Sequence, residues 1–195
     1  VCSSTGIVSD CHNNGDITIT IPELTYTATD SEEDAYKRWQ HQRVGGVIGT
    51  FKSSDGTNAV QGCTNSGKLT YSFLGAKENL RPFFNIGGIC AQGCDDNPTP
   101  EASATVNYGT MNECVNKGQV SLLFNNIDAS NYANIGGVVG YLEGSLLNCI
   151  NDVNATVSFT TDKSNKASAP GVGGVVGSLM CGNIVSCSNK APVNV

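Results

Sequence analysis

Apolar and polar residues alternate in short runs along this chain, and the runs recur. Ile17, Ile19 and Ile21 alternate with threonines, and the same pattern returns from Leu69 and again from Val120. Strict alternation is typical of a strand with one buried face. The pattern therefore predicts several short strands, each with an apolar side and a side rich in hydroxyl groups.

A repeated segment precedes each of these runs. Five segments align without gaps, each with an apolar residue, a cysteine three positions later and an asparagine two positions after that. The cysteines are Cys11, Cys63, Cys114, Cys149 and Cys187. The asparagines are Asn13, Asn65, Asn116, Asn151 and Asn189. Such a repeat predicts layers that stack on one another, because one repeat cannot bury its apolar face alone.

A second element, a glycine pair flanked by Val or Ile, precedes four of these segments. It reads VGGVIG from Val44, IGGICA from Ile86, IGGVVG from Ile135 and VGGVVG from Val172. Glycine pairs allow tight corners or the close approach of two backbones. Because the sequence starts and ends inside a repeat, we expect residues 1–195 to be a single domain that is part of a longer chain.

The spacing inside each repeat predicts which residues face inward. The apolar run starts six residues after the cysteine in the first three repeats and eight residues after Cys149 in the fourth. An insertion of two residues preserves the inner and outer faces. The same parity places the cysteine and the asparagine inside. We expect the asparagines to form a ladder and the cysteines a column of small buried groups, although adjacent thiols of stacked layers could also oxidise to disulfides.

These patterns together predict an all-β fold, a single-stranded parallel β-helix (β-solenoid) of about five coils with loop insertions. The motif of a glycine pair followed by apolar-x-x-Cys-x-Asn-x-Gly resembles the GLUG-type repeats of surface proteins and adhesins, notably of gut Bacteroidetes. Asp152-Val153 and Ala191 depart from that motif. The resemblance implies a right-handed helix, an extracellular position at the cell surface and a role in adhesion to a host or bacterial surface glycan or protein.

The longest departure from the repeat is the insertion 22–43, which contains the run DSEEDAYKRWQHQ. Its N-capping residues, early acids and later bases predict one short helix. The spacing of Tyr36 and Trp39 places both rings on one helix face. Two interpretations follow: the rings cap the open end of the solenoid, or they form an aromatic platform that binds a sugar.

Other departures are less specific. The insertion 91–107 contains Cys94, a candidate for a disulfide or an exposed thiol, and Asp95, Asp96 and Asn97, which predict a turn more strongly than a calcium site. The shorter loops 75–85, 125–134 and 161–170 recur at one place in the repeat. Loops on one side of a repeat protein are where a partner surface is expected.

Composition and charge exclude several classes of function. The formal net charge is −6 and only 14% of residues are charged, with no cluster of Lys and Arg. We therefore expect no nucleic-acid partner, because phosphate binding needs concentrated positive charge. No apolar run is long enough to predict a transmembrane segment. The cysteine count of nine is odd, so at least one thiol has no partner within the chain.

Candidate catalytic groups are few. His12 and His41 have no paired nucleophile in the sequence pattern, and no cofactor or metal motif is present. Asp10 and Glu113 share one column position two coils apart, at about 9.6 Å, which is marginal for an inverting carboxylate pair. We therefore expect a module without catalytic residues or cofactor that acts in adhesion or ligand display. The alternatives are a structural stalk or accessory module and, third, a polysaccharide-cleaving enzyme.

Overall fold

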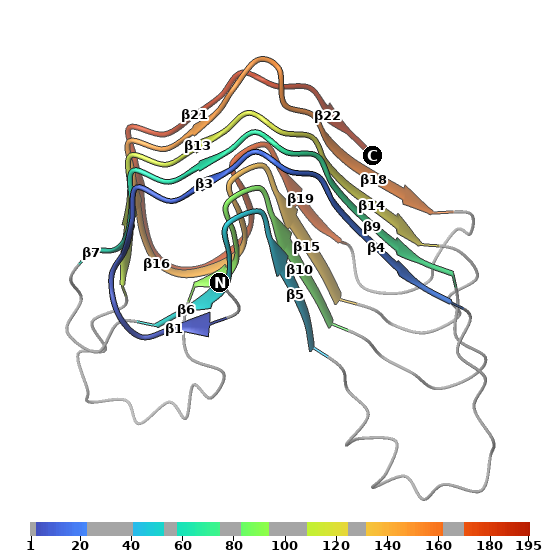
Figure 1. Ribbon diagram of the computed structural model, residues 1–195, viewed down its shortest axis with the longest axis horizontal. Helices are drawn as coiled ribbons and strands as arrows, with labels where there is room; N and C mark the ends of the chain where they lie inside the picture. The colour runs from blue at the N-terminus through green and yellow to red at the C-terminus, as the bar shows by residue number, and fades with distance from the viewer. Residues whose placement is uncertain are drawn as a thin grey trace, which may run out of the picture.

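The computed structural model describes residues 3–22, 41–52, 58–74, 83–93, 109–124, 132–161 and 170–195. Within these ranges the chain consists of strands and turns and contains no helix, so the prediction of an all-β fold is confirmed. The strands form four sheets, and neighbouring strands in every sheet run parallel. Figure 1 shows the strands of successive repeats running side by side.

We number the sheets I to IV. Sheet I has eight strands in the order β1-β6-β11-β16-β12-β7-β2, with β20 paired to β16. Its strands are β1 (Ser3–Ser4), β2 (Val8–Ser9), β6 (Ile48–Phe51), β7 (Asn58–Gln61), β11 (Cys90–Gly93), β12 (Thr110–Asn112), β16 (Val139–Leu147) and β20 (Val176–Val185). β16 pairs with both β11 and β12, so one long curved strand replaces two shorter ones in the later repeats.

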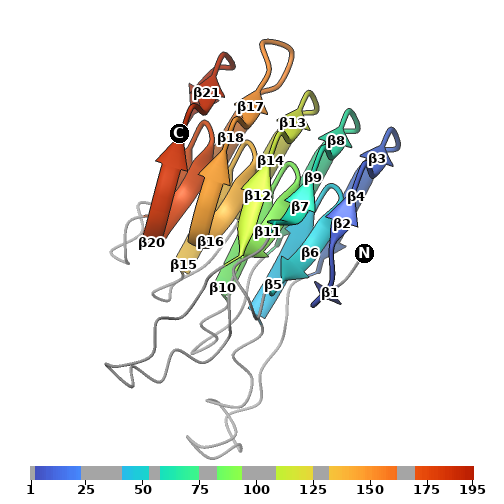
Figure 2. The ribbon, with the colours of Figure 1, turned by 90° about the vertical axis from the view of Figure 1, so that its left-hand side faces the viewer.

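The other sheets take one strand from each repeat. Sheet II contains β5 (His41–Gly45), β10 (Phe83–Gly87), β15 (Tyr132–Gly136) and β19 (Gly171–Gly173). Sheet III contains β3 (His12–Asn13), β8 (Thr64–Asn65), β13 (Val115–Asn116), β17 (Ile150–Asn151) and β21 (Ser188–Asn189). Sheet IV contains β4 (Ile17–Ile21), β9 (Leu69–Phe73), β14 (Val120–Phe124), β18 (Val157–Thr161) and β22 (Val193–Asn194). We call the strands contributed by one repeat a layer; Figure 2 shows the layers in sequence order, with the two termini at opposite ends.

The register between layers follows the repeat. In sheet IV, Leu69 pairs with Ile17 on one side and with Val120 on the other. Within β9, Leu69, Tyr71 and Phe73 are buried while the residues between them are half-buried, as the alternation predicts. The in-register pairing of unequal repeats is possible because their extra residues lie between strands.

The buried side chains form two separate cores. The first core lies between sheets I and III and contains Cys63, Cys114 and Cys149 with Met111 and Leu146. The second core lies between sheets II and IV and is rich in aromatic rings. In it, the ring centroid of Phe84 lies 5.4 Å from that of Tyr71 and 4.6 Å from that of Phe124. Edge-to-face and tilted packing of this kind adds to the stabilisation from burial.

The two-residue insertion of the fourth repeat leaves the register intact. The backbone N–H of Ala155 donates to the carbonyl of Asp152, which closes a turn that exposes Val153. Val157 then pairs with Val120 in the layer before and with Val193 in the layer after. The extra residues are therefore accommodated outside the strands, as their even number predicts.

Several predicted loops are shorter than expected. Residues 83–85 and 132–134 belong to strands β10 and β15, Thr161 ends β18, and residues 91–93 belong to β11. In the insertion 22–43, residues 41–43 lie in β5 and pair with β10, so the helical interpretation is wrong for these three residues. No sequence pattern predicted these strand ends, because a register is set by the neighbouring strand as well as by local propensity. The remainder of the predicted helix lies outside the described residues.

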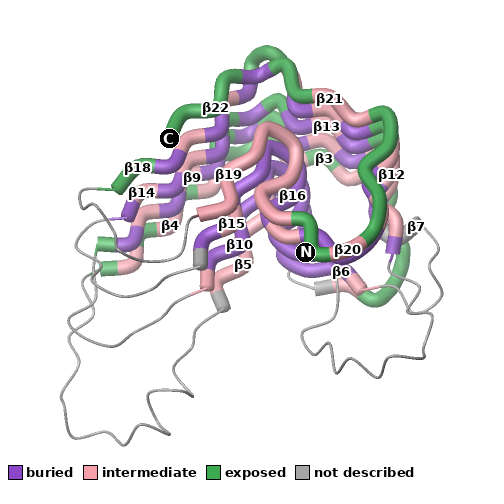
Figure 3. Tube along the Cα trace, turned by 180° about the vertical axis from the view of Figure 1, so that it is seen from behind, coloured by how far each residue is buried: buried purple, intermediate pink, exposed green. Residues whose placement is uncertain are grey.

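Exposure differs along the stack. Ile184 is 44% exposed and its partner Leu146 is fully buried, although both occupy the same position in the repeat. Val193 is likewise 39% exposed where Val157 is fully buried. Figure 3 shows the exposed tube of β20 to β22 beside the buried tubes of the inner layers. These two positions are therefore buried where a layer lies on both sides, although Val8 of the first layer is buried with a layer on one side only.

Candidate functional site

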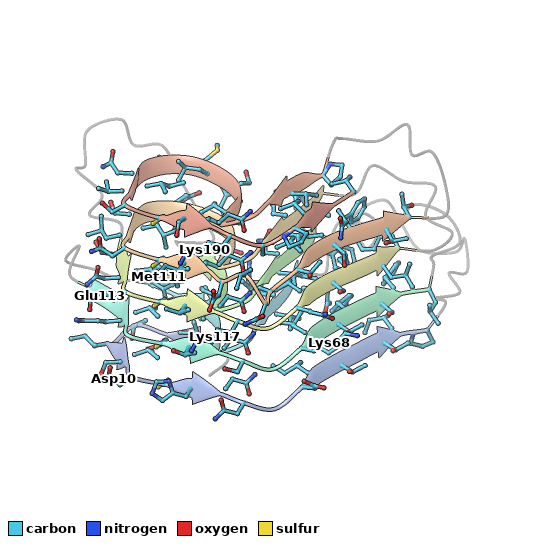
Figure 4. The ribbon with its side chains drawn as sticks, turned by 90° about the horizontal axis from the view of Figure 1, so that it is seen from above. Asp10, Lys68, Met111, Glu113, Lys117 and Lys190 are labelled. Carbon is cyan, nitrogen blue, oxygen red and sulfur yellow. The ribbon has the colours of Figure 1, made fainter. Side chains whose placement is uncertain are left out.

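A sharp corner precedes each register cysteine. The five residues at this corner have a positive φ between 52° and 63°. They are Asp10, Gly62, Glu113, Asn148 and Ser186. The left-handed conformation favours Gly, Asn and Asp, so the corner accounts for most of the residue types found there. Figure 4 shows the side chains of Asp10 and Glu113 on the outer side of this corner, and both are exposed.

The register cysteines lie directly inside that corner and form a column through all the layers. Cys63, Cys114 and Cys149 are fully buried, while Cys11 and Cys187 at the two ends are half-buried. The backbone N–H of Cys114 donates to Sγ of Cys149 at 3.4 Å, and the N–H of Cys149 donates to Sγ of Cys187 at 3.4 Å. Each of these sulfur atoms therefore lies against the backbone of the preceding layer.

The thiols of this cysteine column are free and interact with one another. All seven cysteines in the described part of the chain are free thiols. Hydrogen bonds with Cys149 and Cys63, together with burial, raise the pKa of Cys114. The same contacts lower the pKa of Cys63 to about 6 and lower that of Cys149, because a thiolate there accepts the Cys114 proton. Burial raises the pKa of Cys187 at the end of the column.

The five repeat asparagines form a continuous chain of amide hydrogen bonds. Nδ2 of each residue donates to Oδ1 of the next at 2.8–2.9 Å. The chain runs through Asn13, Asn65, Asn116, Asn151 and Asn189. In Asn13, Asn65, Asn116 and Asn189 the second amide hydrogen goes to a backbone carbonyl two residues later, as from Asn116 to Gly118 at 2.8 Å. We call this chain the asparagine ladder; it satisfies the donors of fully buried amides that would otherwise be costly.

The glycine pairs pack against the asparagine ladder, each against the asparagine of its own repeat. A Cβ on Gly88 would overlap the carbonyl oxygen of Gly137 and the side-chain amide of Asn116. Gly46, Gly137 and Gly174 meet Asn65, Asn151 and Asn189 in the same way. The glycine pair and the Cys-x-Asn segment therefore form one structural unit, in which the glycine turn packs against the ladder and lies between the two cores. Sequence reasoning indicated a close approach at the glycines but not what they approach.

A second polar cluster joins sheets I and II, and no sequence pattern pointed to it. Nδ2 of Asn85 donates to Oε1 of Gln92 at 2.9 Å, and Nδ2 of Asn134 donates to Oδ1 of Asn85 at 2.9 Å. Nε of Arg43 donates to the same Gln92 oxygen. Asn85 and Gln92 are seven residues apart, on the two sides of the glycine turn, whereas Arg43 and Asn134 come from the neighbouring repeats. The turn was predicted, but the pairing across it depends on how sharply the two strands fold back.

A buried carboxylate lies near this cluster on the curved strand β16. Glu143 is 3% exposed and accepts a hydrogen bond from the hydroxyl of Tyr141 at 2.8 Å. Because a buried charge is costly unless it is hydrogen-bonded, the Tyr141 hydroxyl stabilises this position. Among the described residues, no group of three or more His, Cys, Asp and Glu side chains is arranged to hold a metal ion.

The chain leaves the stack repeatedly at one edge. The strands of sheet IV end at Ile21, Phe73, Phe124 and Thr161, which pair with one another in register. The returning strands of sheet II begin side by side, with Phe83 paired to His41 and to Tyr132. The segments 22–40, 74–82, 125–131 and 162–170 connect these strands. We call this edge of sheets II and IV the loop edge.

The outer face of sheet IV is uncharged. It carries hydroxyl groups at Thr18, Thr20, Thr70, Ser72, Ser121, Ser158 and Thr160. The hydroxyl of Ser158 donates to that of Ser121 at 2.9 Å, which links neighbouring layers. The charged residues Lys68, Lys117 and Lys190 lie instead in the turns after the ladder asparagines, as Figure 4 shows.

Several predicted site residues lie outside the described part of the chain. These are Tyr36, Trp39, Cys94, Asp95, Asp96 and Asn97. Cys90 follows a glycine pair, is fully buried and pairs with Ile48 and Val139. His12 is exposed in β3 beside the half-buried Cys11, and the backbone of His41 lies in β5.

The comparisons with known proteins give no relative. A scan against protein-family models, a search of curated proteins and a search of solved structures found no match to this chain. Among the described residues, no helix is long and apolar enough to cross a membrane. Function must therefore be argued from the geometry of the stack.

Proposed function

We propose that this chain is a non-catalytic module for adhesion or ligand display at the cell surface, built on a right-handed, single-stranded parallel β-helix. Its ligand is a glycan or a protein on a host or bacterial surface. The fine description of the fold is supported by the in-register parallel pairing of all five repeats and by the ladder that joins them. The resemblance to GLUG-type repeats supports the same assignment.

The loop edge is the observation that carries this proposal. Ile21, Phe73, Phe124 and Thr161 are neighbours in one sheet, so four connections start within a few strand spacings of each other. Neighbouring strands lie about 4.8 Å apart, so the four starting points span about 14 Å. A rigid scaffold that gathers variable segments on one side is the usual arrangement of a binding surface.

The two acids that sequence analysis paired have a structural explanation. Asp10 and Glu113 occupy the left-handed corner, and their side chains are exposed on its outer side. The layer between them carries Gly62 at this position, and the layers after Glu113 carry Asn148 and Ser186. The backbone therefore adopts the left-handed corner at this position in every layer, whether or not the residue there is acidic. This favours binding over glycoside cleavage.

The test is a binding and turnover assay with the whole chain. We expect retention of the protein on a glycan array or on intact cells, and no release of reducing ends from polysaccharides. Tyr36→Ala with Trp39→Ala tests the aromatic platform. Its matched control is Lys68→Ala with Lys190→Ala, which changes exposed turn residues away from the loop edge. Turnover of a polysaccharide without stable binding would overturn the proposal.

A structural stalk is the second candidate function. The asparagine ladder crosses every layer, and the termini lie at opposite ends of the stack, which is the arrangement of a spacer. A stalk predicts that replacing segments of the loop edge leaves all cell binding of the parent protein unchanged. The display module predicts that binding is lost while the unfolding midpoint remains within the range of the parent.

A further inference from the structure

We infer that Asn154, in the turn between β17 and β18, is an attachment site for an N-linked oligosaccharide. The inference rests on the proposed function, because asparagine-linked glycosylation is a modification of exported chains. Two independent features of the molecule support it. One is the acceptor sequence at this position, and the other is the exposed shape of the turn that carries it.

The acceptor sequence is complete at Asn154. This residue is followed by Ala155 and Thr156, which matches the pattern of Asn, any residue except Pro, and then Ser or Thr. Asn97 also has a threonine two positions later, but Pro98 lies between them and excludes it. Every other asparagine up to Asn189 is followed at that distance by a different residue type. The acceptor sequence therefore coincides with the two-residue insertion of the fourth repeat.

The insertion builds a turn that extends outward from the stack. The backbone N–H of Ala155 donates to the carbonyl of Asp152 at 3.0 Å, and the N–H of Val153 donates to Oδ1 of Asp152 at 2.7 Å. Asp152 therefore holds the turn with both its backbone and its side chain. Val153 is 62% exposed and Asn154 is also exposed. Figures 1 and 2 show this turn, in orange, reaching further out than the turns of the other layers.

Burial alternates through the acceptor sequence. Ala155 and Val157 are buried, whereas Asn154 is exposed and Thr156 is half-buried. The register of Val157 places Ala155 at the position of Gly118 in the layer before. The small middle residue therefore anchors the turn to the stack. The asparagine and the threonine, which a glycosylating enzyme must both recognise, lie on the outer side.

The side-chain amide of Asn154 is available for reaction. Within the described part of the chain, no hydrogen bond to the Asn154 side chain is present. Asn151, three residues earlier, is fully buried, donates to Asn189 and accepts from Asn116. A reaction at Asn151 would break the asparagine ladder, whereas a reaction at Asn154 leaves every ladder bond in place. The fold therefore distinguishes two asparagines of the same turn.

The modification is a group transfer from an oligosaccharide linked to a lipid diphosphate. The amide nitrogen of Asn154 attacks C1 of the first sugar, so a carbon–nitrogen bond forms. The bond from C1 to the diphosphate oxygen breaks, and the lipid diphosphate leaves with its electron pair. One amide proton is released to a base of the transferase. No oxidant or reductant takes part in this exchange.

The position of the glycan suits a display module. Asn154 lies between sheets III and IV, and β18 then runs from Val157 to Thr161 at the loop edge. Four strand steps of about 3.3 Å separate these two residues by about 13 Å. An oligosaccharide on Asn154 therefore covers the ridge between the two sheets and leaves the loop edge free for a ligand.

The experiment uses the purified, folded whole chain as acceptor. It is incubated with an oligosaccharyltransferase and a lipid diphosphate oligosaccharide, and the product is analysed by intact mass and peptide mapping. We expect one oligosaccharide, attached to Asn154. Asn154→Gln and Thr156→Ala should each abolish the transfer, and Thr156→Ser should retain it, because serine also completes the acceptor sequence.

The matched control moves the acceptor sequence by three residues. Val153→Thr in the Asn154→Gln background creates the same pattern at Asn151, whose amide is fully buried. This folded chain should accept the oligosaccharide at least about tenfold more slowly than the parent, because its amide is reached only when the turn opens. Synthetic peptides covering residues 149–160 of both chains have no fold and should be modified at similar rates.

The outcomes separate this inference from the proposed adhesion. Transfer to Asn154 of the folded parent, with an unchanged urea midpoint of the product, supports the site. Transfer to the peptide but not to the folded parent overturns it, and so do equal rates for the folded parent and the folded control. The acceptor assay contains no cells and no adhesion ligand. A chain that fails to bind cells can therefore still accept the oligosaccharide, and the reverse also holds.

Discussion

The asparagine ladder allows a prediction that separates a continuous chain of hydrogen bonds from five independent turns. Asn65, Asn116 and Asn151 are each fully buried, and each both donates to and accepts from a ladder neighbour. Asn116→Ala removes the acceptor of one Asn65 amide hydrogen and the donor to the Asn151 amide oxygen. A buried polar group without its partner costs about 1–3 kcal/mol. The substitution should therefore destabilise the protein by about 2–6 kcal/mol.

Pairs of substitutions make the test sharper. Asn65→Ala and Asn116→Ala delete both partners of one bond, so the double variant leaves fewer groups unsatisfied than the two single variants together. Its cost should be smaller than the sum by about 1–3 kcal/mol. Asn65→Ala with Asn189→Ala is the matched control, because these residues share neither a direct bond nor a common ladder partner. For that pair, the costs should add within about 0.5 kcal/mol.

The assay is equilibrium urea unfolding followed by circular dichroism, with the slope of the free energy against urea checked for constancy. Gln119→Ala, at an exposed position just after the Asn116 turn, reports the cost of a substitution outside the ladder. Equal, additive costs for the adjacent and the separated pair would refute the idea that the ladder acts as a connected network.

The remaining predictions concern the turns and the aromatic core. Gly88→Ala should lower the free energy of unfolding by about 2 kcal/mol or more, because the added Cβ overlaps Gly137 and Asn116. Gly15→Ala is the control: its Cβ meets only Oδ1 of Asn13 at 3.9 Å, so this substitution should change thermal stability little. Deleting Val153 alone should lower the free energy of unfolding by about 3–6 kcal/mol, because the deletion turns the side chains of Val157 and Phe159 outward. Deleting Val153 and Asn154 together keeps the parity and should lower it far less. A similar loss for both deletions would contradict the register argument. Burial raises the pKa of Tyr71 to about 12 from its usual value of about 10. Its folded pKa exceeds its unfolded pKa, so this stabilisation is complete below pH 10 and is lost as pH rises through 12, by about 2–3 kcal/mol. Tyr71→Phe should flatten that part of the stability profile in urea unfolding at each pH.

The sequence by itself determined the repeat and its inner face. The alternation at Leu69, Tyr71 and Phe73 and the constant distance from cysteine to asparagine were enough to predict strands, layers and buried positions, because side-chain parity is a local property of a strand. The even insertion after Asn151 could also be interpreted from sequence alone, because parity survives any insertion of two residues.

Only the tertiary structure determined which residues of different elements contact one another. The contact of Gly88 with Asn116 joins two elements of one repeat that lie apart in the sequence, and the pairing of Asn85 with Gln92 depends on how sharply the backbone folds at the glycine turn. The left-handed corner at Asp10 and Glu113 was hidden, because Ser186 and Glu113 are not typical residues for that conformation. The alignment of the register cysteines in successive layers likewise follows from the stacking of the layers. The distance between layers is set by backbone hydrogen bonds, whatever residues the layers carry.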